Sequence, residues 1–261
     1  MRVVSLHRYP VKGCYREDLD TADVEPWGLR GDRRWLIVDT ASGKGLTQRE
    51  APLLTRIRPA TVPGGLVLRS PGKKDLDVAE PAGEARTVQV HRDFLKGVTA
   101  PAASGWLSEL LDRDVWLAWL ADPTQRPVDP QYARADDRVS FADGYPLLLT
   151  SMASLGALNA ELDEPLPMNR FRPNVVVDGE HPWAEDDWQR LRIGDLPFRG
   201  PKDCARCVVT TTDQETGERG REPLRTLGRI RKLRHGLLFG RNLIPDATGT
   251  LSVGDPLAVS A

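Results

Sequence analysis

Proline and glycine residues interrupt this chain along its whole length and limit what it can fold into. The 261 residues include 21 prolines and 23 glycines, and both residue types tend to end regular elements. Most runs between them are short and rich in β-branched side chains, which favour extended backbone. The pattern therefore predicts many short strands and few helices, which is a β-rich α+β fold.

The first part of the chain reads as a twisted, mostly antiparallel sheet or barrel. We expect its strands over residues 3–9, 34–39, 53–60, 65–69 and 87–91. A helical stripe with Ser104 as a cap follows, and then a strand over 115–120. The proline-rich loop that comes next indicates a boundary near residue 120, with one domain over 1–120 and a second over 121–261.

The second part contains the clearest helix of the sequence, over residues 152–162, directly after a buried strand over 147–149. The apolar side chains of this helix fall on one face, and Thr150 and Ser151 are placed to cap it. A strand over 175–177 is expected next. Short strands then alternate with Gly-Asp turns, so this domain is also β-rich.

The charged residues argue against several classes of function. The 36 basic and 37 acidic side chains are interspersed and nearly cancel, whereas nucleic-acid and membrane-surface proteins carry a basic excess or stripe. We find no leader sequence, and no apolar run approaches the roughly 18 residues of a membrane span. The three cysteines do not make a disulfide framework, which favours a reducing compartment. We therefore expect a cytoplasmic protein that binds neither nucleic acid nor membranes.

Two of the cysteines, Cys204 and Cys207, lie close together in a charged segment. The β-branched run over 208–212 predicts a strand behind Cys207, which would hold its sulfur in a fixed place. Lys202 and Arg206 make the surroundings electropositive and so favour the thiolate, the form that attacks or binds metals. Cys207 is therefore the first candidate for a catalytic residue. The alternatives are a structural zinc site, a thioredoxin-like redox pair and two buried small side chains.

A second set of candidates is dispersed, each member in or beside a loop at the end of a predicted strand. If these arginines and a lysine converge, they would suit a phosphate-bearing anion held by bidentate hydrogen bonds. For any single one of them, a solvated surface position is the alternative. The set comprises Lys12, Arg33, Arg49, Arg170, Arg172 and Arg206.

Other familiar catalytic patterns do not occur. The sequence has no Gly-x-Ser-x-Gly elbow and no Walker or Rossmann glycine pattern. The histidines show no spacing typical of a metal site or a catalytic dyad, so we assign all of them to structural or surface roles. They are His7, His91, His181 and His235.

Six motifs, taken in order along the chain, resemble those of the MOSC superfamily. The first three are Tyr9-Pro10-Val11-Lys12, Gly31-Asp32-Arg33-Arg34-Trp35 and Phe141-Ala142-Asp143-Gly144-Tyr145-Pro146. The others are Phe171-Arg172-Pro173-Asn174, Cys204-Ala205-Arg206-Cys207 with Thr210-Thr211-Thr212-Asp213, and Val253-Gly254-Asp255-Pro256. The resemblance is to the subgroup that holds the mitochondrial amidoxime-reducing component and bacterial N-hydroxylaminopurine-detoxifying enzymes. It implies an N-terminal β-barrel-like domain packed on a C-terminal MOSC-type β-barrel with a few helices.

The resemblance further implies a molybdenum cofactor, whose metal is bound by one pyranopterin dithiolene and one protein cysteine. Cys207 matches the position of that ligand, and a soft thiolate suits such a metal. Lys12 and Arg33 match positions that hold the cofactor's phosphate. Gly13 stands where the family often has a serine, so a backbone N–H would have to replace one phosphate contact.

The pterin would be held by residues of the later motifs. The matching positions are Asp143, Tyr145, Arg172 and Arg206, with Arg170 and Asn174 as adjacent candidates.

The implied activity is the reductive cleavage of the N–O bond in N-hydroxylated compounds. Some relatives carry a ferredoxin-like domain with an iron–sulfur cluster, and this sequence has no cysteines left to bind one. Electrons would then come from a separate protein of the ferredoxin or flavoprotein type. The alternative is a carrier of sulfur, as a persulfide on Cys207, or of the molybdenum cofactor, without catalytic turnover.

Overall fold

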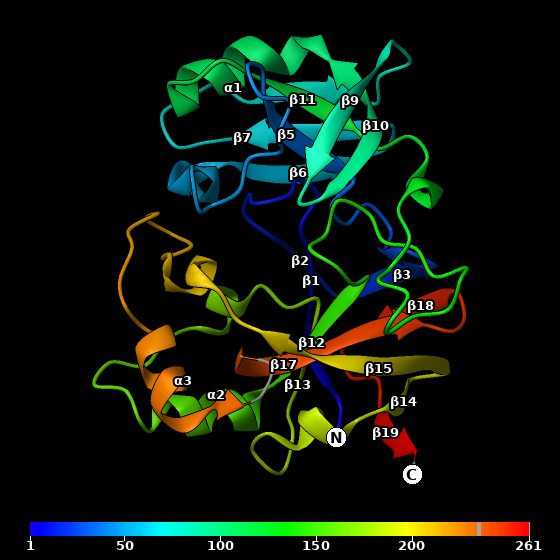
Figure 1. The fold of residues 1–261 in the computed structure, drawn as a ribbon, viewed down its shortest axis with the longest axis vertical. Coiled ribbons are helices and arrows are strands. Elements are labelled where there is room, and N and C mark those ends of the chain that lie inside the picture. The colour runs from blue at the N-terminus through cyan, green and yellow to red at the C-terminus, as the bar shows by residue number, and fades with distance from the viewer. Residues whose placement is uncertain (234–235, 261) are drawn as a thin grey trace.

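The computed structural model describes residues 1–233 and 236–260 and is dominated by strands. Its described part contains three α-helices, so the predicted β-rich α+β fold is confirmed. Figure 1 shows an upper half, coloured blue to green, above a lower half that is mostly green to red. His235 lies outside the described residues.

The lower half is built on a nine-stranded sheet in which β12 and β13 run parallel. In spatial order its strands are β19 (Leu257–Ser260), β14 (Arg190–Ile193), β15 (Leu196–Ala205), β17 (Gly236–Pro245), β12 (Leu147–Ser151), β13 (Val175–Val177), β1 (Val3–Arg8) and β2 (Glu17–Leu19), with β16 (Lys232–Leu233) paired to β17. A three-stranded sheet of β18 (Gly249–Ser252), β3 (Thr21–Glu25) and β4 (Gly28–Leu29) lies beside it.

The upper half has a four-stranded and a three-stranded sheet. The first orders β5 (Trp35–Asp39), β11 (Val115–Trp119), β10 (Asp93–Ala100) and β9 (Ala85–Val90), and the second orders β6 (Arg58–Val62), β7 (Gly65–Arg69) and β8 (Leu76–Ala79). α1 (Ser104–Leu111) covers this half, whereas α2 (Met152–Asn159) and α3 (Leu224–Ile230) belong to the lower half. The 3-10 helices are η1 (Pro52–Arg56), η2 (Pro101–Ala103), η3 (Pro123–Gln125), η4 (Met168–Phe171), η5 (Ala184–Asp187) and η6 (Val208–Thr211).

The N-terminal strands pair with the C-terminal part of the chain. β1 lies between β2 and β13 in the large sheet, and β3 pairs with β18. Strand pairing therefore unites residues 3–29 with the lower half, while the division at residue 120 stays a prediction about the sequence. The segment over 9–15 and the turn over 30–34 pass between the halves, which brings Lys12 and Arg33 to the junction.

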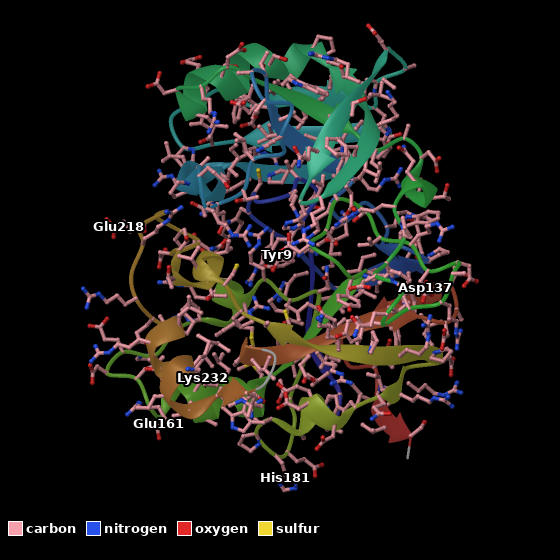
Figure 2. The ribbon with its side chains drawn as sticks, viewed as in Figure 1. Tyr9, Asp137, Glu161, His181, Glu218 and Lys232 are labelled. Carbon is pink, nitrogen blue, oxygen red and sulfur yellow. The ribbon has the colours of Figure 1, made fainter. Side chains whose placement is uncertain are left out.

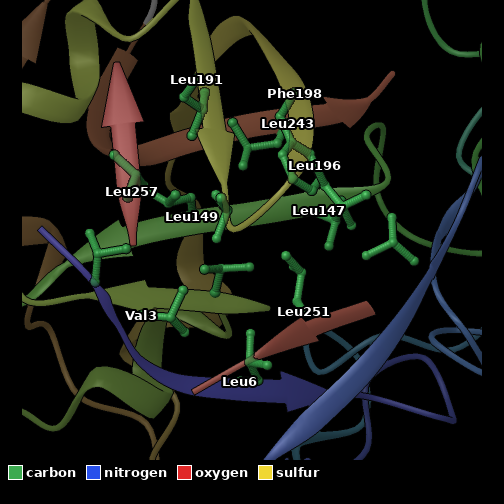
Figure 3. Packing of buried hydrophobic residues seen from close by; sticks show 14 of the residues in the cluster. Val3, Leu6, Leu147, Leu149, Leu191, Leu196, Phe198, Leu243, Leu251 and Leu257 are labelled. Atoms are coloured by element: carbon green, nitrogen blue, oxygen red, sulfur yellow. The ribbon is translucent and has the colours of Figure 1, made fainter. Parts of the chain in front are cut away.

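The main core contains side chains of the large sheet and of the β18-β3-β4 sheet, and they come from both ends of the chain. Val3 and Leu6 of β1 pack in one cluster with Leu147, Phe198 and Leu257, as Figure 3 shows. A β-bulge between Val3 and Ser5 shifts the register, so Val3 and Leu6 both point inward although they are three residues apart. The bulge leaves the side chains of Ser5 and His7 on the other face of the strand.

Two predicted elements differ from the structure at their starts. The strand expected over 53–60 begins only at Arg58, because Pro52 opens the 3-10 turn η1, which buries Leu54. Ser104 is the first residue of α1 rather than its cap, since the turn η2 precedes it. The Ser151 cap of α2 is confirmed, because its hydroxyl accepts hydrogen bonds from Ala153 N and Ser154 N. Within the described ranges, no helix is long and apolar enough to cross a membrane.

Candidate functional site

A pocket of about 290 Å³ lies at the junction of the two halves, at the lower end of the range of small-molecule sites. The predicted site residues are far apart along the chain, and the pocket brings all of them together except Arg170. The predicted site residues that line it are Lys12, Gly13, Arg33, Asp143, Tyr145, Arg172, Asn174, Arg206 and Cys207, and Arg49 of the dispersed set joins them. The cationic side chains therefore converge on the cysteine.

Cys207 lies just beyond the end of β15 and directly precedes η6. The strand predicted over 208–212 is wrong, because Val208–Thr211 form the 3-10 turn η6 and Thr212 makes an isolated bridge to Arg219. The hydroxyls of Thr210 and Thr211 donate to Cys207 O and Val208 O at 2.9 and 2.8 Å. Threonine hydroxyls that bond to nearby carbonyls offer the backbone an alternative to a β-ladder. The turn still holds Cys207 in one place, by bonds to its own carbonyl.

Each thiol of the motif has an arginine beside it. Arg49 Nη2 lies 3.2 Å from Cys207 Sγ, and Arg206 Nη1 lies 2.7 Å from Cys204 Sγ. Burial raises the pKa of Cys204, an effect that Arg206 opposes. Cys14 is fully buried in the core of the upper half and does not line the pocket. Two guanidinium groups are thus placed to stabilise negative charge on sulfur.

Within the described residues, no metal site made of protein ligands alone accompanies these cysteines. Among the described residues, no group of three or more His, Cys, Asp or Glu side chains is placed to hold a metal ion. The zinc alternative therefore gains no support, since a structural zinc site needs four protein ligands.

Tyr9 organises two of the arginines. Its ring is buried, and the guanidinium carbons of Arg33 and Arg172 lie 4.2 and 4.3 Å from its centroid. The Tyr9 hydroxyl donates to Pro173 O at 3.1 Å, and Figure 2 shows Tyr9 between the two halves. Tyr9 belongs to the first of the six motifs, but its role could not be predicted from the sequence, because stacking between distant segments leaves no local pattern.

Arg33 is held by a set of buried oxygen atoms. Its Nη1 donates to Asp32 Oδ2 at 2.6 Å and to Asn174 Oδ1 at 3.0 Å. Asn174 in turn donates from Nδ2 to His7 O at 3.1 Å. Asn174 is almost completely buried, so in this structure it positions Arg33 as well as lining the pocket.

Lys12 and Asp143 form a pair at the edge of the pocket. Lys12 Nζ donates to Phe141 O at 2.7 Å and to Asp143 Oδ1 at 2.5 Å. Burial lowers the pKa of Lys12, and the Lys12 charge holds the pKa of Asp143 well below its usual range. The side chain of Asp143 is 73% exposed, so the pair has one buried and one open end.

Gly13 occupies a position that tolerates little else. Its φ is +82°, and a Cβ atom there would lie 2.9 Å from Leu54 Cδ1. Gly13 O accepts a hydrogen bond from Gln48 Nε2 at 2.7 Å. The serine that the resemblance leads one to expect here would be strained, so this local geometry accounts for the departure.

A pair of buried amides joins the halves beside the pocket. Gln48 Nε2 donates to Gln214 Oε1 at 2.9 Å, and Gln214 Nε2 donates to Gln48 Oε1 at 3.1 Å. Arg172 Nη1 also donates to Gln214 Oε1, at 3.0 Å. The amide pair thereby fixes one arginine of the pocket, and nothing in the sequence around Gln48 or Gln214 predicts their contact.

Arg170 does not line the pocket. It donates from Nη1 to Thr211 O at 3.0 Å and from Nη2 to Asp213 Oδ2 at 2.8 Å. Arg170 therefore anchors the end of η6 in this structure, and its contact with a cofactor stays a prediction.

Two buried polar groups of the pocket have no hydrogen-bond partner among the described residues. The Tyr145 hydroxyl and Arg206 Nε are buried and make no hydrogen bond to any described residue. Within the same described part of the chain, Arg49, Arg172 and Arg206 form no ion pair with a carboxylate. Buried polar groups and charges are costly unless they are paired. The pocket therefore fits an anionic ligand with several hydrogen-bonding groups.

Comparison with known proteins agrees with this geometry. Residues 1–114 match the MOSC N-terminal beta barrel domain, and residues 136–258 match the MOSC domain. The mitochondrial amidoxime-reducing component 1 of Homo sapiens is 32% identical over 278 residues, covering 98% of this chain and 82% of that protein. The molybdenum cofactor sulfurase of Anopheles gambiae is 34% identical over 254 residues, covering 87% of this chain and 32% of that protein.

Both domains are thus matched in the order that the six motifs follow, and the similarity to the human protein extends over nearly the whole chain. The chain belongs to the MOSC family, in the branch with an N-terminal MOSC β-barrel domain.

Proposed function

We propose that this protein binds a molybdenum cofactor in the junction pocket and reduces N-hydroxylated compounds. The observation that carries the proposal is the placement of Cys207 among arginines that have no carboxylate partner in the described residues. The names of the relatives, an amidoxime-reducing component and a molybdenum cofactor sulfurase, support the same chemistry.

The residues of the pocket suit the metal, the phosphate and the pterin of such a cofactor. The Cys207 thiolate would bind the metal, while Lys12, Arg33 and the backbone of Gly13 would hold the phosphate. The unpartnered Tyr145 hydroxyl and Arg206 Nε would hydrogen-bond to the pterin, as would Arg172 and Asp143. When bound, the cofactor supplies two-electron redox chemistry coupled to oxygen transfer.

The protein's own part is to bind, orient and neutralise. Arg49 holds the Cys207 sulfur and stabilises its negative charge. A separate ferredoxin- or flavoprotein-type carrier would supply the electrons, and a reducing, cytoplasmic setting would keep the thiol free. The roles of these residues and the N-hydroxylated substrate class are parts of the proposal.

The deciding experiment compares Cys207→Ser with Cys204→Ser, a matched change three residues away. Both variants and the wild type are produced in a host that synthesises the cofactor, and bound molybdenum and pterin are measured. We expect near-stoichiometric molybdenum in the wild type and in Cys204→Ser. Cys207→Ser should lose the metal or change its spectrum. Wild type without molybdenum and without pterin would remove the reductase proposal.

A sulfur carrier is the second candidate, and the two cysteine–arginine contacts favour it. A persulfide on Cys207 would be anionic, and Arg49 is in place to stabilise it. In that case persulfide labelling disappears in Cys207→Ser, while the wild type contains no molybdenum. The same set of proteins therefore separates the two functions.

A further inference from the structure

The hairpin of β1 and β2 carries a second polar cluster. Ser5 Oγ lies 3.0 Å from His7 Nε2, and His7 Nδ1 lies 2.6 Å from Asp18 Oδ1. A hydroxyl on one ring nitrogen and a carboxylate on the other is the arrangement that activates a serine nucleophile. Sequence spacing gave no hint of it, because Asp18 reaches His7 only across a strand pair.

The fold fixes this cluster without a flexible loop. Ser5 and His7 are two residues apart on β1, on the face turned away from the core by the bulge. His7 and Asp18 are directly opposite each other in the antiparallel pair of β1 and β2. Cross-strand neighbours of this kind hold a constant separation, so the three groups are preorganised.

The cluster opens into a surface cleft of about 440 Å³. This cleft shares no lining residue with the junction pocket. Arg16 and Asn169 line it beside the three residues of the cluster. Arg16 Nε lies 2.7 Å from Asp18 Oδ1, and Asn169 Oδ1 is buried without a partner among the described residues. An unsatisfied amide in a cleft is suited to a ligand.

His7 is uncharged in this cluster at neutral pH. Burial, aided by the charge of Arg16 and opposed by Asp18, lowers the pKa of His7 to about 4. The imidazole is then neutral at pH 7, so one ring nitrogen is free to accept a proton.

We propose that Ser5, His7 and Asp18 form a second active site that hydrolyses small carboxylic esters independently of any cofactor. Ser5 Oγ attacks the ester carbonyl carbon, and its proton passes to His7 Nε2. The C–O bond to the alcohol breaks, and the alcohol leaves with that proton. Water then attacks the Ser5 acyl ester by the same route and releases the acid. Asp18 holds the ring by accepting from Nδ1 throughout.

Arg16 and Asn169 complete the site. The Arg16 guanidinium supplies the hydrogen-bond donor that would stabilise the negative carbonyl oxygen of the tetrahedral intermediate, whereas the unpartnered Asn169 Oδ1 would accept a hydrogen bond from the substrate. The reaction consumes only ester and water, so it needs no electron donor.

The test uses the purified full-length protein and diisopropyl fluorophosphate, with adducts located by peptide mass spectrometry. We expect a phosphoryl adduct on Ser5 and p-nitrophenyl acetate hydrolysis that Ser5→Ala abolishes. His7→Gln and Asp18→Asn should each slow labelling of Ser5 by about 100-fold or more. The side chain of Asp18 is 66% exposed, so Asp18→Asn leaves a folded protein even if His7→Gln does not.

Ser260→Ala is the matched control, because Ser260 is an exposed serine on another strand of the same sheet. This variant should label and hydrolyse like the wild type. Labelling of Ser5 no faster than that of Ser260, or labelling that Asp18→Asn leaves unchanged, would overturn the proposal. Cofactor-free protein must give the same rates as the loaded protein, so this test is independent of the reductase proposal.

Discussion

Tyr9 shows how a single residue can set the geometry of the pocket. Its ring lies within cation–π distance of the guanidinium groups of both Arg33 and Arg172. The hydroxyl adds only one hydrogen bond, to Pro173 O. The aromatic ring, rather than the hydroxyl, is therefore the part that the site needs.

Replacing Tyr9 separates these two contributions. We expect Tyr9→Leu to weaken cofactor retention about 10-fold or more, because two cation–π contacts of roughly 1–2 kcal/mol each are lost. Tyr9→Phe keeps the ring and should stay within about threefold of the wild type. Molybdenum content after stepwise dialysis measures the difference. Equal loss in both variants would show that the hydroxyl, not the ring, matters.

His7 should make the stability of the protein depend on pH. Its pKa is 6.5 in the unfolded chain and about 4 in the folded protein, so between these values the unfolded state binds the extra proton. Stability is therefore fully present above pH 6.5 and is lost as the pH falls toward 4. Between pH 7.5 and pH 5 the loss is about 2 kcal/mol.

Chemical denaturation at these two pH values tests the contribution of His7. His7→Gln cannot take up this proton, so its stability should fall by about 2 kcal/mol less than that of the wild type over the same interval. His181→Gln is the control, since His181 is exposed (Figure 2) and should leave the pH dependence as it is. An identical loss in the wild type and in His7→Gln would contradict the buried neutral histidine.

At the scale of elements, the buried strands could be predicted and the turn after Cys207 could not. Runs such as Leu147–Ser151 and Val175–Val177 are apolar enough to mark their strands. The run after Cys207 has equally β-branched side chains, but the hydroxyls of Thr210 and Thr211 bond to nearby backbone carbonyls. The β-propensity of the side chains does not take these local hydrogen bonds into account.

The Gln48–Gln214 pair connects two such loops and should act as a unit. Gln48→Leu removes two hydrogen bonds from the buried Gln214 amide, which keeps only Arg172 Nη1 and Thr212 O as partners. This loss should cost about 1–3 kcal/mol of unfolding free energy, and Gln214→Leu, which leaves Gln48 Oε1 without this partner, should cost about as much. Replacing both should cost less than the sum of the single changes, because the two hydrogen bonds between the amides are lost only once.

A double-mutant cycle with urea denaturation measures this coupling. We expect a coupling energy of about 1 kcal/mol or more. Gln131→Leu, at an exposed glutamine, supplies the control and should change stability by less than about 0.5 kcal/mol. Strict additivity of the two substitutions would mean that the pair does not join the halves.

At the scale of the whole molecule, order along the chain and order in space differ. The six motifs predicted one site, but no sequence pattern showed that β1 would lie between β13 and β2. Pairing between distant strands depends on the register and packing of the finished sheet. For the same reason the arginines could be named from the sequence while their convergence on Cys207 required the structure.

The lower half should fold only with its N-terminal strands, because β1 contributes Val3 and Leu6 to its core and β3 pairs with β18. The ends of the chain meet there: Leu257 N donates to Met1 O at 2.9 Å, and Figure 1 places both termini together. A permuted chain of residues 121–260 joined by a short Gly-Ser linker to residues 1–31 should therefore melt cooperatively. Residues 121–260 alone should not, since a buried sheet edge would be left open.

Thermal melting followed by circular dichroism compares these two chains with the permuted chain carrying Leu6→Asp. That substitution puts a charge at a fully buried core position, which should abolish the cooperative transition. Cooperative melting of residues 121–260 by themselves would show that the C-terminal half is an independent domain. In that case the sheet would fold without the N-terminal strands. If residues 121–260 do not fold without those strands, the two ends of the sequence form one folding unit.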